Sequence, residues 1–163
     1  MHPIRLAAPG DLPRMVEIYN QAILAGNATA DTVPLRLEQR HEWFRQHTKD
    51  TYPIYCATSY GGVIGYLSVS PYRERPALMR SAEISYYIDY SCHGQGFGSA
   101  LLVHAIEDAS RIHKKIYLAI VLEGNDGSQR LLEKHGFERW GHLPEVAEFG
   151  GRTVGHLYYG RRV

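Results

Sequence analysis

The segment from Ser91 to Ser99 constrains this chain more than any other. It carries glycines at alternate positions, Gly94, Gly96 and Gly98, between a strand-like run and a helix-like run. Glycine lets the backbone turn tightly and come close to a ligand. The start of the following helix leaves unpaired N–H groups and a partial positive charge. We therefore predict an anion site here, most naturally for the phosphates of a cofactor.

The bulk composition is that of an ordinary globular domain. The chain has 163 residues, 44% hydrophobic and 21% charged, and we predict a single domain over residues 1–163. The formal net charge is +1, so bulk electrostatics favour neither nucleic acid nor a membrane as a partner. No apolar run approaches the roughly 20 residues that cross a bilayer, and no signal peptide is visible.

The cysteines and histidines argue against disulfides and metals. Cys56 and Cys92 form no C-x-x-C pair, which is typical of free thiols in a reducing compartment. The histidines are scattered, without an H-E-x-x-H motif or a close Cys/His cluster. We therefore predict a cytoplasmic protein without a metal site.

Hydrophobic periodicity divides the chain into strands and helices. Strands are predicted at residues 4–7, 54–58, 63–70, 82–88, 116–121, 137–143 and 154–159. Helices are predicted from an N-cap at Asp11 to residue 26, from 37 to about 49, at 99–113 and at 125–135. This order implies an α/β (α+β) domain in which helices cover a mixed sheet.

A dinucleotide-binding Rossmann unit is the first alternative for the glycine segment. The local order of strand, glycine turn, helix and strand fits, and Glu123 closes the second strand where a ribose-binding acid belongs. However, the glycines follow G-x-G-x-G rather than G-x-G-x-x-G, and the context of the motif is wrong. A Walker loop is excluded because no Gly-Lys-Ser/Thr follows.

A different comparison accounts for the segment better. Residues 93–98, His-Gly-Gln-Gly-Phe-Gly, resemble the Q/R-x-x-G-x-G/A signature with which GNAT N-acetyltransferases bind the pyrophosphate of acetyl-coenzyme A. Residues 18–20, 83–88 and 125–137 are similar to the phosphinothricin (bialaphos) acetyltransferase branch of that superfamily. The resemblance implies the GNAT fold, with about seven strands and about four helices. It also implies a homodimeric enzyme that uses acetyl-coenzyme A.

The resemblance further assigns roles to residues. Backbone amides of the glycine segment would hold the pyrophosphate, and two backbone positions in the strand before it would pair with the pantetheine arm. Asn125 could also be only the N-cap of its helix. The predicted cofactor-binding residues are Tyr86, Ile88, His93, Gly94, Gln95, Gly96, Phe97, Gly98, Ser99, Asn125 and Ser128.

Glu83 matches a glutamate that is proposed as the general base in this branch. An amine attacks a thioester only when it is neutral, yet near pH 7 a free amine is mostly protonated. A carboxylate in a partly buried cleft can have a raised pKa and accept that proton. The alternative is a salt bridge from Glu83 to Arg80 or another arginine of the loop at residues 71–81.

Weaker candidates for the acceptor site are Tyr19, Tyr72, Arg73 and Arg75. Tyr19 belongs either to the cleft or to the core, because a tyrosine on an apolar helix stripe is commonly buried. Arginines in the loop would pair with a carboxylate or phosphinate, or they simply form a solvated surface.

The chain departs from the family pattern at three places. His93 stands where the signature usually has Gln or Arg, and Leu132 stands where many GNAT enzymes have a tyrosine general acid and this branch often has His. The C-terminal G-x-W-x-D pattern of the branch is replaced at residues 151–154 by Gly-Arg-Thr-Val. These departures leave the acid for the leaving thiolate unassigned and put a herbicide-type acceptor in question.

We expect an N-acetyltransferase that acts on the primary amine of a small molecule, an amino acid or a phosphinothricin- or methionine sulfoximine-like analogue. Direct attack in a ternary complex is expected, since Cys92 lies beside the pyrophosphate loop and is badly placed to form an acetyl-enzyme. The alternatives are an acetyltransferase for a polyamine or a protein N-terminus, and a non-catalytic coenzyme A-binding sensor.

Overall fold

One mixed sheet runs through the computed structural model, which describes residues 2–163. Its strands are β1 (Ile4–Leu6), β2 (Ile54–Ser59), β3 (Gly62–Pro71), β4 (Ser81–Ile88), β5 (Ile116–Leu122), β6 (Glu138–Phe149) and β7 (Arg152–Arg162). The α-helices are α1 (Leu12–Ala25), α2 (His41–Arg45), α3 (Phe97–Asp108) and α4 (Asp126–Lys134). The predicted α/β class, with seven strands and four helices, is confirmed.

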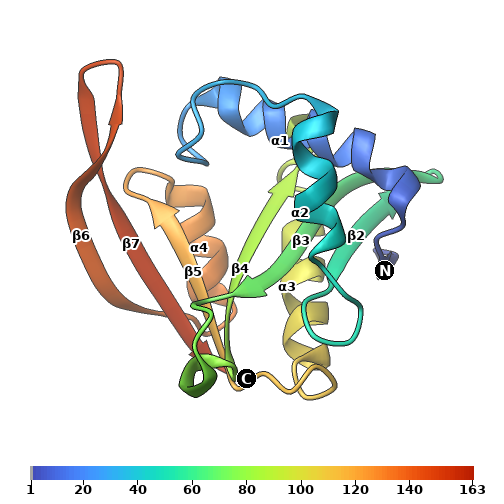
Figure 1. The fold of residues 1–163 in the computed structure, drawn as a ribbon. Helices are drawn as coiled ribbons and strands as arrows, with labels where there is room; N and C mark the ends of the chain where they lie inside the picture. The colour runs from blue at the N-terminus through green and yellow to red at the C-terminus, as the bar shows by residue number, and fades with distance from the viewer. Residues whose placement is uncertain (1) are drawn as a thin grey trace.

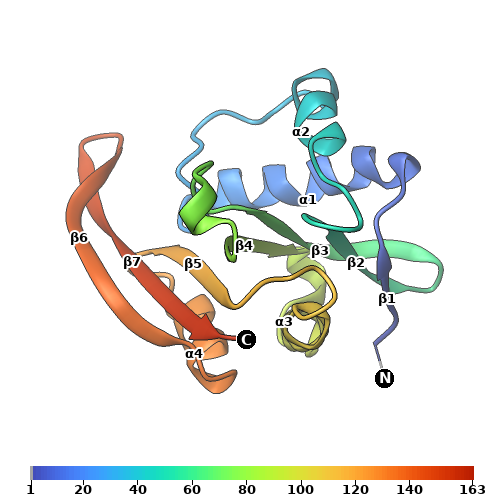
Figure 2. The same ribbon diagram turned by 60° about the horizontal axis from the view of Figure 1, so that its bottom comes forward.

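Helices cover both faces of the sheet (Figure 1, Figure 2). Helices α1 and α2 lie on one face, where Met15 and Ile18 pack against Tyr66. Helices α3 and α4 lie on the other face, where Leu101 and Leu132 belong to the larger core. The alternation of β-strand side chains separates these two cores, because successive residues point to opposite faces.

The sheet is divided at its centre by two strands that separate. The strand order is β1-β2-β3-β4-β5-β7-β6, and β4 and β5 are parallel neighbours while the other pairs are antiparallel. The parallel pairing extends only from Ser81–Ile116 to Glu83–Leu118. Beyond these pairs β4 continues to Ile88 and β5 to Leu122, and the two strands diverge in Figure 1.

Local sequence signals explain the turns that were predicted correctly. Helix α1 ends at Gly26, whose φ of 76° is the left-handed conformation that glycine adopts without strain. The β2–β3 hairpin turns through Tyr60 and Gly61, which both have positive φ, as a type I′ turn requires.

Several predicted boundaries are wrong. The helix predicted at 37–49 is a 3₁₀ turn (Leu37–Arg40) followed by the short α2, and the helix predicted at 99–113 is α3, which begins and ends earlier. Strands β6 and β7 exceed their predicted lengths, since the polar and exposed residues of β6 mask its strand pattern. Asp11 precedes α1, but its carboxylate binds Arg5 and the Ala8 N–H instead of capping the helix.

The packing of α3 on the sheet gives a direct test of the fold. Leu101 is fully buried in the larger core, whereas Val103 on the same helix is 39% exposed. Replacing a buried leucine removes apolar contacts and leaves a cavity, so Leu101→Ala is expected to lower the free energy of unfolding by about 3 kcal/mol. The matched control Val103→Ala is expected to change it by less than about 0.5 kcal/mol. Urea titration measures both; equal effects would contradict the assigned helix face.

Candidate active site

The glycine segment forms an open loop that ends at the start of α3. Gly94 and Gly96 have φ of 75° and 88°, and Gly96 is the N-cap of the helix. The amide of Ala100 donates to the Gly96 carbonyl at 3.0 Å. The N–H groups of the three residues before Ala100 therefore have no partner within the helix. These N–H groups and the positive end of the helix dipole lie together at the end of the glycine loop. This is the backbone geometry that an anion site requires.

A cleft of about 860 Å³ opens beside this loop, between the separated ends of β4 and β5 and the start of α4. The predicted cofactor residues that line it are Tyr86, Ile88, His93, Gly94, Gly96, Phe97, Gly98, Ser99, Asn125 and Ser128. Gln95 does not line the cleft: its side chain is exposed and donates to the Ser91 carbonyl at 3.1 Å. Its contribution is to the shape of the loop.

The free edge of β4 presents backbone groups to the cleft. Gly65 and Ile88 are partners in the β3–β4 ladder, and the Asp89 amide donates to the Ile64 carbonyl at 2.8 Å. This pattern identifies Gly65–Ile88 as a non-hydrogen-bonded pair, so the N–H and C=O of Ile88 point away from β3. By the alternation of the ladder, those of Tyr86 do so too. The side chain of His93 lies against this edge, with its Nε2 3.0 Å from the Ile88 carbonyl oxygen.

The start of α4 forms the opposite wall of the cleft. The Asn125 side chain accepts a hydrogen bond from the Ser128 amide at 3.3 Å, so the N-cap role is real. The Ser128 hydroxyl is 2.5 Å from the hydroxyl of Tyr86, which joins α4 to β4 across the cleft. Burial raises the pKa of Tyr86 to about 12, and the phenol therefore stays protonated at neutral pH.

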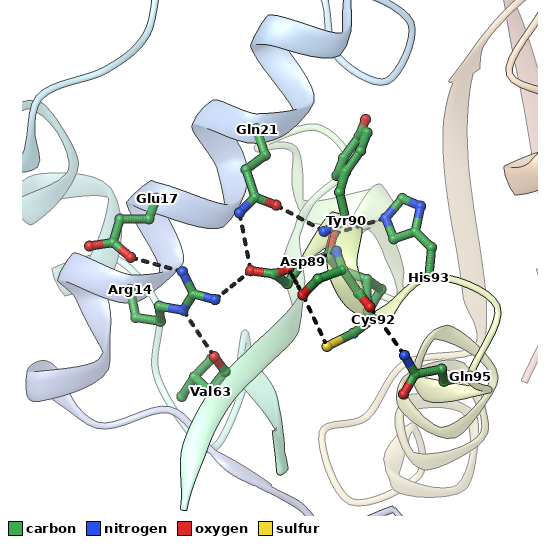
Figure 3. A network of polar contacts seen from close by, with 11 residues as sticks. Arg14, Glu17, Gln21, Val63, Asp89, Tyr90, Cys92, His93 and Gln95 are labelled. Carbon is green, nitrogen blue, oxygen red and sulfur yellow. Dashed lines mark hydrogen bonds and ion pairs between the residues drawn. The ribbon is translucent and has the colours of Figure 1, made fainter. Parts of the chain in front are cut away.

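Asp89, which the sequence analysis missed, is the centre of a polar network below the loop (Figure 3). Its buried carboxylate accepts hydrogen bonds from Arg14, from Gln21 Nε2 at 3.1 Å and from the Ser91 amide at 2.8 Å. Gln21 also accepts from the Tyr90 amide at 2.9 Å. These donors hold the pKa of Asp89 well below its usual range. The network ties α1 to the glycine segment.

A local signal for Asp89 exists in the sequence. An aspartate followed two residues later by serine is typical of an Asx turn, in which the carboxylate accepts from the backbone two residues on. The long-range part, from Arg14 and Gln21 on α1, has no signature in the sequence.

Glu83 lies where the β4–β5 pairing ends, one residue before the cleft lining begins at Ile84. Its side chain is half-buried, and burial raises its pKa, an effect that the positive charge of Arg73 partly offsets. Among residues 2–163, none forms a salt bridge with Glu83 within 4.0 Å. The alternative of an ion pair with Arg80 is therefore not realised.

The weaker acceptor candidates lie outside the cleft. Tyr19 is 7% exposed, and its hydroxyl bonds with Thr29 at 2.8 Å and with Asp31, so it belongs to the core. Arg73 stacks over the ring of Tyr72, with its guanidinium 4.6 Å from the ring centroid.

Tyr72, Arg73 and Arg75 all belong to the segment between β3 and β4, in which both arginines are exposed. Leu132 is fully buried in the core. Because leucine has no ionisable group, this position supplies no acid. The described residues contain no cluster of three metal-ligating side chains. Their helices are too short or too polar to cross a bilayer.

Fold, loop and cleft together define a class of protein. A family profile described as acetyltransferase (GNAT) domain matches residues 3–138. The chain therefore belongs to the GNAT acetyltransferase family. Within that family it falls among the phosphinothricin acetyltransferase-like enzymes and is an N-acetyltransferase, as its relatives show.

Three relatives illustrate this. YwnH of Bacillus subtilis (strain 168), whose name describes it provisionally as a phosphinothricin acetyltransferase, is 39% identical over 98% of both chains. An L-methionine sulfoximine/L-methionine sulfone acetyltransferase of Pseudomonas aeruginosa is 35% identical over 93% of this chain and 88% of the relative. The crystal structure of a phosphinothricin acetyltransferase from Sinorhizobium meliloti in complex with acetyl-coenzyme A is 28% identical. It superposes with a TM-score of 0.94 over 99% of this chain and 88% of that chain.

The Asp89 network predicts a loss of stability on removal of one charge. Asp89→Asn leaves Arg14 without its buried carboxylate partner, and the free energy of unfolding at pH 7 is expected to fall by about 2 kcal/mol. Glu17→Gln is the matched control, because this carboxylate also bonds Arg14 but is 65% exposed. It is expected to change stability by less than about 0.5 kcal/mol.

The Asp89→Asn variant also gives a pH test. Because the pKa of Asp89 is lower in the folded protein, its contribution is fully present above the ordinary carboxyl pKa of about 3.9. The contribution is lost as the pH falls through the depressed pKa. Urea titrations at pH 7 and near pH 3 should therefore show the gap between wild type and Asp89→Asn narrowing in acid. A gap independent of pH would contradict the network.

Proposed function

We propose that this enzyme transfers the acetyl group of acetyl-coenzyme A to the primary amine of a small amino acid or of a phosphinothricin- or methionine sulfoximine-like analogue. The amine attacks the thioester directly within a ternary complex. The observation that carries the proposal is the half-buried carboxyl of Glu83 at the point where β4 and β5 separate, at one end of the cleft. The family resemblance also supports a cytoplasmic homodimer.

The dimensions of the cleft support the cofactor. The pyrophosphate would bind the amides at the start of α3, as phosphates do at helix N-termini. From Ile88 to Glu83 an extended strand spans about 17 Å, at about 3.3 Å per residue. An extended pantetheine arm that pairs with the free edge of β4 would therefore bring its thioester from the glycine segment to the vicinity of Glu83.

The acceptor would approach from the face that Glu83 shares with Ser85 and Tyr87. On β4 these residues alternate with Ala82 and Ile84, which point into the larger core. Arg73 is close enough to influence the pKa of Glu83, and it carries a guanidinium that suits a carboxylate, phosphinate or sulfoximine-bearing amino acid. Two relatives named for such compounds support this class of acceptor.

The chemistry follows from the state of Glu83. As a carboxylate it removes a proton from the acceptor ammonium, and the neutral amine then attacks the acetyl carbonyl. The nitrogen of the tetrahedral intermediate then gives its extra proton to solvent, and the C–S bond breaks to release the amide and the coenzyme A thiolate. A thiol has an ordinary pKa of about 8.5, so its thiolate leaves readily and can take a proton from solvent without an acid at Leu132.

The direct test is the release of free thiol from acetyl-coenzyme A in the presence of a panel of amines. The panel contains amino acids, phosphinothricin, methionine sulfoximine, polyamines and short peptides. Turnover confined to amino acids and their acidic analogues supports the proposal. Turnover with polyamines or peptides instead, or cofactor binding without any turnover, would point to the alternatives.

Removing the base is expected to slow the reaction. Glu83→Gln should lower kcat by about 100-fold, because the ammonium then loses its positioned proton acceptor. In the wild type, kcat/KM should rise with pH as the Glu83 carboxyl ionises through its raised pKa, and this rise should disappear in the variant. Glu74→Gln, which changes an exposed carboxylate in the segment between β3 and β4, is the control and should retain the wild-type rate. An unchanged pH profile in Glu83→Gln would contradict the assignment of Glu83 as the general base.

The pyrophosphate site has its own test. Gly96 has a positive φ that other residues adopt only with strain, and a Cβ there would meet the His2 ring at 3.2 Å. Gly96→Asp also adds a charge that repels phosphates, so its Kd for acetyl-coenzyme A is expected to rise at least about 100-fold. Gly10→Asp is the control, because Gly10 is exposed with no atom in reach of an added Cβ. Calorimetry measures both; normal affinity in Gly96→Asp would place the pyrophosphate elsewhere.

A further inference from the structure

Helix α4 presents different side chains to each of its surroundings, because successive residues of a helix turn by about 100°. On one side Glu133 accepts a hydrogen bond from the Tyr159 hydroxyl of β7 at 2.9 Å. Leu132 is buried in the larger core. Arg130 and Lys134, which are one turn apart, both line the cofactor cleft. The function described so far uses neither of these two basic residues.

This part of α4 packs against the start of α3 through Leu131 and His135. A Cβ added to Gly98 would lie 2.9 Å from Leu131 Cδ2, and His135 Nε2 lies 2.7 Å from Ser99 Oγ. Each of the two basic residues directly precedes one of these contact residues in the chain. The two basic residues therefore stand beside the part of α3 whose amides have no partner within the helix.

The charges at this end of the cleft are positive. Of the described residues that line the cleft, Arg130 and Lys134 alone are arginine or lysine, and neither forms a salt bridge within 4.0 Å with another of residues 2–163. The lining carboxylate, Asp126, lies two turns before Lys134, about 12 Å away along the helix axis. Burial lowers the pKa of His135, and the positive charges of Lys134 and Arg161 lower it further. Two cations without a paired carboxylate therefore border the cleft beside α3.

The start of α3 and the two basic side chains suit different phosphates. Backbone amides and the helix dipole offer a partial positive charge, which suits the singly charged phosphates of a pyrophosphate. A phosphomonoester carries a charge of about −1.5 to −2 at pH 7, and arginine and lysine side chains are its usual partners. Coenzyme A carries such a group as the 3′-phosphate of its ribose.

The direction of the pantetheine arm determines where this phosphate would lie. In the proposed function the arm runs from the glycine segment along β4 toward Glu83, into the sheet. The ribose is on the other side of the pyrophosphate, so it would lie toward solvent. Arg130 and Lys134 are both exposed, and residues one turn apart are only about 6 Å apart along a helix. Both side chains can therefore reach one phosphate at the solvent end of the cleft.

We propose that Arg130 and Lys134 bind the 3′-phosphate of the cofactor, so that the enzyme selects acetyl-coenzyme A over acetyl donors that lack this group. The proposal rests on the proposed function, in which acetyl-coenzyme A is the donor. The Arg130 guanidinium offers two parallel N–H donors to phosphate oxygens, and the Lys134 ammonium acts as a compact positive charge. If the two residues are only a solvated helix face, the affinity does not depend on the 3′-phosphate.

The test measures by calorimetry the Kd of acetyl-coenzyme A and of acetyl-3′-dephospho-coenzyme A, without an acceptor amine. The wild type is expected to bind the first at least about tenfold more tightly, because the second cannot form the charge-assisted hydrogen bonds to the 3′-phosphate. In the double variant Arg130→Gln/Lys134→Gln this ratio should fall below about threefold. The Kd of the dephospho compound should stay within about threefold of wild type, which also shows that the variant is folded.

Two further variants are the controls. Arg36→Gln/Lys49→Gln changes the net charge by the same amount at two exposed residues outside the cleft, and it should keep the wild-type ratio. The exchange Arg130→Lys/Lys134→Arg keeps both positive charges at the cleft and should keep most of the ratio.

Three results would overturn the proposal: a wild type that binds both compounds equally, a variant Arg130→Gln/Lys134→Gln that keeps the wild-type ratio, or one that loses affinity for both compounds alike. The last result would assign the two cations to the pyrophosphate or to the fold. If the wild type binds neither compound, acetyl-coenzyme A is not the donor, and the proposed function fails as well.

Discussion

Three residue pairs join β4 to β5, and the architecture of the site follows from the fact that this parallel pairing then stops. Strands in the interior of a sheet normally satisfy their N–H and C=O groups on both sides. Past Glu83 the edge of β4 that faces β5 has no neighbouring strand, although the strand is central in the sheet. A ligand with amide groups of its own can satisfy this edge, as a further strand would.

Two segments hold the separated strands in place. On one side, Tyr86 and Ser128 join β4 to the start of α4 across the opening. Below the glycine segment, the Asp89 carboxylate accepts hydrogen bonds from side chains of α1 and from its own turn. A helix on one face of the sheet therefore helps to fix the position of the loop at the opening. The arrangement combines a gap in the sheet with the glycine loop and the start of α3 at its mouth.

The parts of this arrangement that could be predicted from the sequence are those with local causes. The glycine spacing, the Asn125 cap and the Gly26 stop each depend on a few consecutive residues, and the structure contains all three. The network around Asp89 joins residues up to 75 positions apart, and nothing in a linear pattern records which arginine will meet which aspartate.

Tyr19 illustrates the same limit within one helix. Its position on the apolar stripe of α1 fits both a core and a cleft residue, and only the packing of Thr29 and Asp31 over its hydroxyl decides between them. In strand β6 the sequence pattern does not indicate the full length of the strand that forms. Its mostly exposed residues lack the apolar alternation of a strand, and its pairing with β7 over most of its length is what makes it one.

The place of β7 in the sheet also has a consequence for how the protein is made. Although β7 is the last strand in chain order, it lies between β5 and β6 and pairs with both. During synthesis the preceding strands emerge first, and until β7 follows, one edge of β5 exposes the unpaired backbone N–H and C=O groups that later pair with β7. The sheet therefore closes by insertion of its final strand, so a nascent chain that lacks residues 152–162 presents an open edge to chaperones and to other chains.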